Sequence, residues 1–167
     1  MSFQELTDSL ETLLRQHEQM IELGSKKKEA LIVNNVDLLN ETVNKEARLL
    51  KLIVEADARR VKAANEMLRE RGFMPTPSLK VAQLVRMMTN PADKLALSEI
   101  ADRLSAAMEK LRVLNDLNMN LAKHSIEFND YSLSLLTGGY DDQDYVYKKP
   151  SDSSYGKSNL KIFDSRA

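Results

Sequence analysis

The feature that most constrains this chain is a heptad pattern that runs without a break from Pro91 to Leu136. No proline follows Pro91 until Pro150, and no glycine occurs between Gly72 and Gly138. Apolar side chains recur in alternating steps of three and four, which places them on one face of a long helix. Nine of the twelve positions on this face are apolar, and Asn118, Ser125 and Ser132 are polar: Leu97, Ile100, Leu104, Ala107, Leu111, Leu114, Asn118, Leu121, Ser125, Phe128, Ser132 and Leu135. Such a face needs other helices to cover it.

The rest of the chain supplies those helices. We predict helices over about residues 2–33, 36–71, 78–88 and 91–136, separated by an Asn34–Asn35 turn, by Gly72 with Pro75 and Pro77, and by an Asn90–Pro91 start signal. Ser78 can cap the short helix. The fold class is all-α, an elongated antiparallel bundle or coiled-coil hairpin with a long C-terminal helix.

Three details of the helices carry expectations of their own. Gly24 with Ser25 can bend or split the first helix, although good helix formers follow and favour a single helix. The seam of the second helix is expected to include Val36, Leu39, Val43, Leu50, Ile53, Ala64 and Met67. Asn118 on the fourth seam allows two interpretations: a buried residue that fixes register, or part of a face that meets a partner helix.

Residues 137–167 differ in composition from the helical part, residues 1–136. They hold three of the five glycines and four of the five tyrosines, and their five acidic and five basic side chains balance. Because apolar side chains are sparse, we predict a disordered tail whose tyrosines can anchor a partner.

Composition argues against several classes of function. The formal net charge of −1 lacks the basic excess of a nucleic-acid-binding protein, and no stretch predicts membrane insertion. The chain has no cysteine, and its histidines, His17 and His124, lack the Glu-x-x-His spacing of a di-metal bundle. We therefore expect a cytosolic binding protein with no cofactor, no metal and no catalytic site.

Three stretches resemble the flagellar export chaperones of the FlgN type. They are VNNVDLLNETVNKEARLL leading to Arg59–Arg60, the segment VLNDLNMNLAKHSIEFNDYSLSLL, which is similar to the family's LNxxNxxLL motif, and a tyrosine-rich tail that closes in IFDSRA. Asn115, Asn118 and Leu121 match the motif, whereas Ala122 stands at its second leucine.

The resemblance implies a cytosolic chaperone that binds hook-filament junction proteins, the hook-associated proteins, and delivers them to the export gate of the flagellar type III secretion apparatus. It implies cargo binding in the C-terminal part, and an amphipathic helix as cargo suits the apolar face of the fourth helix. The expected cargo-binding residues are Leu111, Leu114, Asn115, Asn118, Leu121 and Phe128. A tail tyrosine, Tyr147 or Tyr155, is expected to dock at the gate.

The main alternative is a self-associating coiled-coil structural or adaptor protein, and a homodimer is compatible with either interpretation. The turns between helices and the seam positions His17, Gly24 and Ser125 weigh against a continuous coiled coil.

Overall fold

The computed structural model describes residues 2–75 and 80–138, and over these residues the chain is all helix and turn without a strand. Four helices follow one another: α1 (Ser2–Ile32), α2 (Val36–Glu70), α3 (Val81–Met87) and α4 (Pro91–Leu136). The predicted all-α bundle is confirmed. The predicted tail and its tyrosines lie outside the described residues, as does Ser78. The predicted start of the short helix is wrong, because α3 begins at Val81 and Lys80 is its N-cap.

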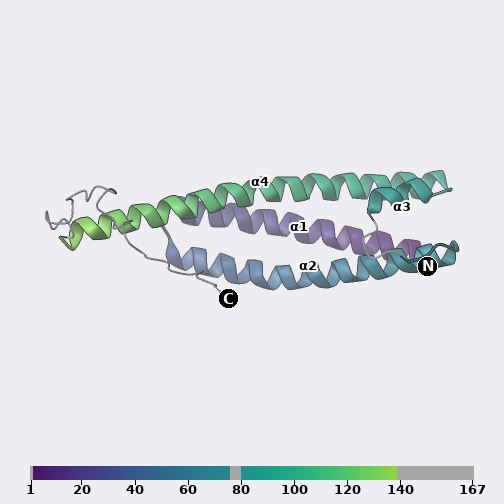
Figure 1. Ribbon diagram of the computed structural model, residues 1–167, viewed down its shortest axis with the longest axis horizontal. Helices are drawn as coiled ribbons and strands as arrows, with labels where there is room; N and C mark the ends of the chain where they lie inside the picture. The colour runs from purple at the N-terminus through teal and green to yellow at the C-terminus, as the bar shows by residue number, and fades with distance from the viewer. Residues whose placement is uncertain (1, 76–79, 139–167) are drawn as a thin grey trace, which may run out of the picture. The chain divides into compact units, whose positions relative to one another are not determined.

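The chain divides into two parts, residues 1–127 and 128–167. In the first part α1 lies between α2 and α4 (Figure 1). α1 and α4 run in the same direction, and α2 runs antiparallel to both. In the second part, the described residues form the last turns of α4 and the two residues after it.

The turn between α1 and α2 follows from its two asparagines. Asn34 adopts a φ of 52°, a left-handed conformation that asparagine tolerates better than most residues. Asn35 is the N-cap of α2, and its side chain accepts a hydrogen bond of 3.0 Å from the Leu38 amide. The sequence prediction of a turn at these residues is therefore confirmed.

The predicted stop and start signals also have a physical explanation in the structure. Gly72 adopts a φ of 77° after α2, and the amides of Gly72 and Phe73 donate to the carbonyls of Arg69 and Leu68, which is a Schellman motif. The Asn90 side chain accepts from the Ala92 amide at 3.0 Å and so caps α4.

The hydrophobic core joins the first half of α1, the second half of α2, α3 and the first turns of α4. It contains Leu6, Leu10, Leu13, Leu14, Ala56, Ala63, Ala64, Met67, Leu68, Leu84, Met88, Leu97, Leu104 and Ala107. α3 closes this end, because Leu84 is 0% exposed and Arg71 donates to the Met87 carbonyl at 2.7 Å. We call it the sealed end, and the end near the α1–α2 turn the open end.

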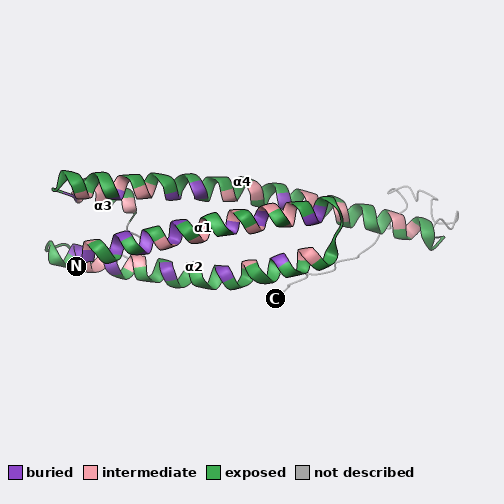
Figure 2. Ribbon diagram, turned by 180° about the vertical axis from the view of Figure 1, so that it is seen from behind, coloured by how far each residue is buried: buried purple, intermediate pink, exposed green. Residues whose placement is uncertain are grey.

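The predicted seam of α2 is wrong in its first half. Val36, Val43 and Leu50 are 59%, 45% and 55% exposed. The buried residues are instead Thr42, Leu49, Ala56 and Ala63, which are spaced seven residues apart. Thr42 and Leu49 each precede a residue of the predicted seam by one position, so they lie on the neighbouring face of the helix. α1 packs on this neighbouring row, and α4 does not cover the other, so the predicted seam stays open toward solvent at the open end. Figure 2 shows the result, with burial concentrated on α1 and long exposed stretches on α2 and α4.

Candidate functional site

The α1–α4 contact that shapes the open end is built on Gly24. α1 runs through Gly24 as one helix, as the sequence favoured. A Cβ at Gly24 would lie 2.8 Å from Leu114 Cδ2, which is closer than real Cβ contacts. Glycine therefore lets the two helices approach each other here.

Asn118 completes this contact. Its side chain is buried, and its Nδ2 donates to the Gly24 carbonyl at 2.8 Å. Because that carbonyl can only accept, the bond fixes the amide orientation. Within the described residues, Asn118 Oδ1 is buried without a hydrogen-bond partner. Of the two interpretations of Asn118, the structure favours a buried residue that fixes how α1 and α4 meet.

An apolar groove of about 870 Å³ lies beside this contact, between α2 and α4, with α1 as its floor. We call it the α2–α4 groove. Its apolar lining is Met20, Leu31, Leu39, Val43, Ala47, Leu50, Ile53, Leu111, Met119 and Ala122. Its polar lining is His17, Lys27, Asn40, Glu46, Asn115 and Asn118.

Two polar interactions hold the floor of the α2–α4 groove. Lys27 Nζ lies 2.7 Å from Glu46 Oε2, and both side chains are mostly buried, so this ion pair ties α1 to α2. His17 Nδ1 lies 2.7 Å from the Leu13 carbonyl, which occupies that ring nitrogen within α1.

The predicted cargo-binding residues do not gather in one place. Leu111, Asn115 and Asn118 line the α2–α4 groove, whereas Leu114 lines the opposite side of the α1–α4 contact. Leu121 is half-buried and lines neither. Phe128 belongs to the second part of the chain and is 68% exposed. Tyr147 and Tyr155 lie outside the described residues.

The sequence interpretation missed the α2 wall of the groove. Leu39, Val43 and Leu50 were assigned to a core seam, because their spacing is that of a covered helix face. The available signal was that α2 carries two heptad rows, one through Thr42 and Leu49 and one through Val43 and Leu50. A single neighbouring helix covers only one of them.

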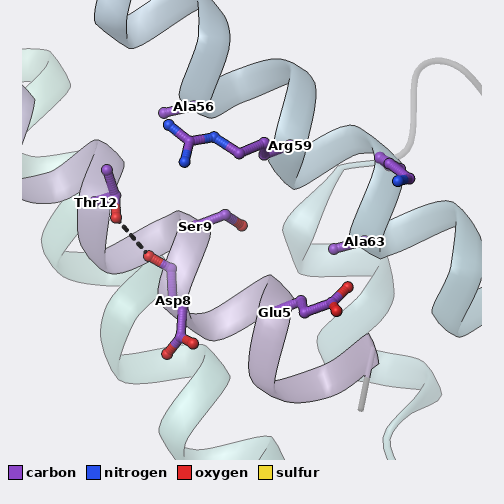
Figure 3. Close-up of a pocket in the computed structure, with 8 residues that line it drawn as sticks. Glu5, Asp8, Ser9, Thr12, Ala56, Arg59 and Ala63 are labelled. Carbon is purple, nitrogen blue, oxygen red and sulfur yellow. Dashed lines mark hydrogen bonds between the residues drawn. The ribbon is translucent and has the colours of Figure 1, made fainter.

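A second, polar cleft of about 350 Å³ lies between α1 and α2 (Figure 3). Ala56 and Ala63 line it, with Glu5 and Asp8 on α1 and Arg59 and Lys62 on α2. Its hydroxyl groups already donate to helix carbonyls, Ser9 to Leu6 at 2.7 Å and Thr12 to Asp8 at 2.8 Å. This arrangement is typical of a solvated seam between helices whose charges balance.

The described residues show no constellation for metal or membrane chemistry. No cluster of three or more His, Asp or Glu side chains in residues 2–75 and 80–138 is placed to hold a metal ion. None of the helices described here carries an apolar stretch long enough to cross a bilayer. The α2–α4 groove is the strongest candidate site because ten apolar residues from three helices line it.

Comparison with known proteins decides the family. A family model described as FlgN protein matches residues 1–152. The chain belongs to the FlgN family of flagellar export chaperones. A curated relative, the uncharacterized protein YvyG of Bacillus subtilis (strain 168), is 24% identical to this FlgN-family chain over 168 residues and the whole length of both proteins. No solved structure matches the FlgN-family chain described here significantly. The resemblance seen in the three sequence stretches is thus confirmed at the level of the family.

Proposed function

We propose that this FlgN-family chain is a cytosolic chaperone for hook-filament junction proteins, and that the α2–α4 groove receives an amphipathic helix of the cargo. The observation that carries the proposal is the open apolar row of α2, Val43 and Leu50, facing Leu111 and Met119 of α4. Apolar surface left exposed between helices commonly marks a binding site. A helix laid in this groove would cover the apolar row of α2 that α4 leaves open.

The proposal moves the expected cargo site from one face of α4 to a surface shared by three helices. Leu111, Asn115 and Asn118 remain in it as the α4 wall. Leu114 and Asn118 also hold α4 to α1, so they position this wall whether or not they touch cargo. Leu121 continues the apolar stripe of α4 beyond the groove and would extend the contact along a longer cargo helix. Phe128, in the second part of the chain, stays a separate proposal for a cargo contact.

The test is binding of purified hook-filament junction proteins, measured by size-exclusion chromatography with light scattering and by calorimetry. Val43→Asp and Leu50→Asp place a carboxylate in the groove at positions that are already half exposed, so the fold should tolerate them. Each is expected to weaken cargo binding by about tenfold or more, because the charge must be desolvated when the helix docks.

Val54→Asp is the matched control. Val54 lies on the same helix, is 62% exposed and does not line the groove. If Val54→Asp weakens binding as much as Leu50→Asp, the groove is not the cargo site. If the intact chain binds neither junction protein and forms a stable oligomer alone, the self-associating scaffold becomes the better interpretation.

We further propose that Tyr147 or Tyr155 docks the loaded chaperone at the flagellar export gate. The support is the family membership together with the place of both tyrosines in the polar segment of residues 137–167. Single Tyr147→Ala and Tyr155→Ala variants should separate the two: the docking tyrosine, once removed, lowers export of junction proteins while cargo binding in solution is unchanged. If both single variants and the double variant support export at the level of the natural chain, this part of the proposal is contradicted.

A further inference from the structure

A second apolar groove lies on the other side of the α1–α4 contact. It has a volume of about 640 Å³, and we call it the α1–α4 groove. Ala106, Val113, Leu114 and Leu117 of α4 line it, and its polar lining includes Ser25 of α1. Val113 and Leu117 are 55% and 45% exposed, although they are large apolar side chains on a helix that packs against α1.

Two of the three charged side chains that line this groove are basic. Lys28 lies on the α1 wall and Lys110 on the α4 wall, and in the part of the chain that the structure describes neither forms an ion pair. The groove also contains Glu109, but its carboxylate lies 2.7 Å from Arg112 Nη2 and accepts a second bond of 3.0 Å from Arg112 Nε. That hydrogen bonding and the charge of Arg112 lower the pKa of Glu109. The charge left available on the two walls is positive.

We propose that the α1–α4 groove is a second docking surface, and that it takes an amphipathic helix of a partner protein whose apolar stripe is flanked by acidic residues. The walls are two helices, and the apolar positions on α4 are spaced seven and four residues apart, which is the spacing that a packed helix meets. Acidic residues on both flanks of the incoming stripe would pair with Lys28 and Lys110, as flanking charges do in coiled coils.

The two grooves are separate surfaces. Gly24, Leu114 and Asn118 form the contact between them, with Asn118 lining one groove and Leu114 the other. A helix in the α2–α4 groove therefore leaves Val113, Leu117 and both lysines uncovered. The chain could hold a cargo helix on one side and an acidic partner helix on the other, and the second surface does not depend on what the first one binds.

The test uses two synthetic helical peptides of three heptads, each bridged so that it stays a single helix. Both carry the same apolar stripe, and one has Glu and the other Lys at the flanking positions. Binding to the full-length protein is measured by fluorescence anisotropy of the labelled peptide. We expect the Glu peptide to bind about tenfold more tightly than the Lys peptide, and its affinity to fall as salt rises.

Two sets of variants locate the binding. The charge-reversed Lys28→Glu, Lys110→Glu double variant should exchange the preference for the two peptides, and Leu117→Asp should weaken both. Leu50→Asp, in the other groove, separates the two sites, because it should weaken peptide binding less than Leu117→Asp does. Val54→Asp, which lines neither groove, is the matched control and should leave the peptide affinity unchanged. Circular dichroism checks that each variant keeps its helix content.

The proposal is overturned if the Glu peptide does not bind, if both peptides bind equally well, or if Leu50→Asp weakens binding as much as Leu117→Asp. It is also overturned if light scattering shows that the free chain is a dimer that Leu117→Asp converts to a monomer, because the groove is then covered by a second copy. Loss of junction-protein binding in Leu50→Asp, measured separately, reports only on the other groove.

Discussion

At the scale of single residues, the structure depends most on the absence of a side chain at Gly24. Glycine in a helix interior normally makes the helix about 1 kcal/mol less stable than alanine does. Here α4 comes close enough that a Cβ would meet Leu114 Cδ2 at 2.8 Å. The helix-weakening residue is tolerated because it allows α1 and α4 to meet between the two grooves.

This contact predicts different effects for small and large substitutions at Gly24. Gly24→Ala should stay within about 1 kcal/mol of the natural chain, because the gain in helix propensity offsets a small shift of the flexible Leu114 side chain. Gly24→Leu should lower the free energy of unfolding by about 1–3 kcal/mol, because it forces α4 away from α1. Urea unfolding followed by circular dichroism measures both. Glu22→Leu, at an exposed position of the same helix, is the control, and equal stability of the two leucine variants would contradict the prediction.

Asn118 makes a second prediction at this scale. Asn118→Leu should leave stability within about 1 kcal/mol or raise it, since it removes a bond to Gly24 but also a buried oxygen without a partner. Asn118→Asp should destabilise the fold by about 2 kcal/mol or more at neutral pH, because a carboxylate would face the Gly24 carbonyl.

The pH dependence of Asn118→Asp distinguishes this cause from simple loss of packing. A protonated carboxyl can donate to the Gly24 carbonyl, so folding should raise the pKa of the introduced group above its ordinary value of about 4. The penalty should therefore be present at neutral pH and shrink as pH falls below the raised pKa. Stability measured from pH 7 to pH 4, as a difference from the natural chain, gives the sign. A penalty that does not change with pH would contradict the account.

At the scale of elements, α3 is too short to be stable by itself. It has seven residues, and isolated helices shorter than about 12–15 residues are marginal in water. It persists because Leu84 is fully buried against the core of the sealed end. Packing therefore decides whether this helix forms.

This dependence predicts a large cost for Leu84→Ala. We expect the free energy of unfolding to fall by about 2–5 kcal/mol. The shorter side chain buries less apolar surface and leaves a cavity between α3 and the core. Gln83→Ala on the same helix is the control, with a smaller loss of about 1 kcal/mol from the hydrogen bond its side chain accepts from the Lys80 amide. Thermal and urea unfolding measure both, and equal losses would show that α3 is held by its cap and not by the core.

The same scale explains what sequence reasoning could and could not predict. The presence of the helices and the positions of the turns between them could be predicted from local chemistry, as at Asn35, Gly72 and Asn90. The burial of α2 did not, because Thr42 and Val43 lie on adjacent heptad rows and either row could face a neighbour. Choosing between them requires knowing where α1 and α4 lie, which is information about packing between distant segments. The groove was missed for that reason.

At the scale of the whole molecule, the first part of the chain is unevenly built. At the sealed end α3 covers the core, and Leu6, Leu10 and Leu97 are each 0% exposed. The open end has the α2–α4 groove in place of a fourth helix, and exposed apolar residues on both walls. Regions with few buried apolar contacts open locally at lower free energy than the core. The proposed binding surface thus coincides with the end that we expect to be less stable.

This gradient predicts the pattern of amide hydrogen exchange. In the free protein, amides of α1 near Leu10 should exchange more slowly than those near Leu31, although both lie within one continuous helix. When a junction protein is bound, exchange should slow in α2 around Val43 and in α4 around Asn115, because the cargo helix supplies the missing packing there. Amides around Leu10 should change little, since their packing is complete without cargo.

Leu50→Asp separates cargo-induced protection from a general effect of complex formation. With this variant, the slowing around Val43 should be lost at cargo concentrations that saturate the natural chain, while exchange around Leu10 stays as it was. Uniform exchange along α1 in the free protein would contradict the two-ended description. Cargo protection confined to the last turns of α4 would mean that the chaperone binds through the second part of the chain and that the groove between α2 and α4 serves another purpose.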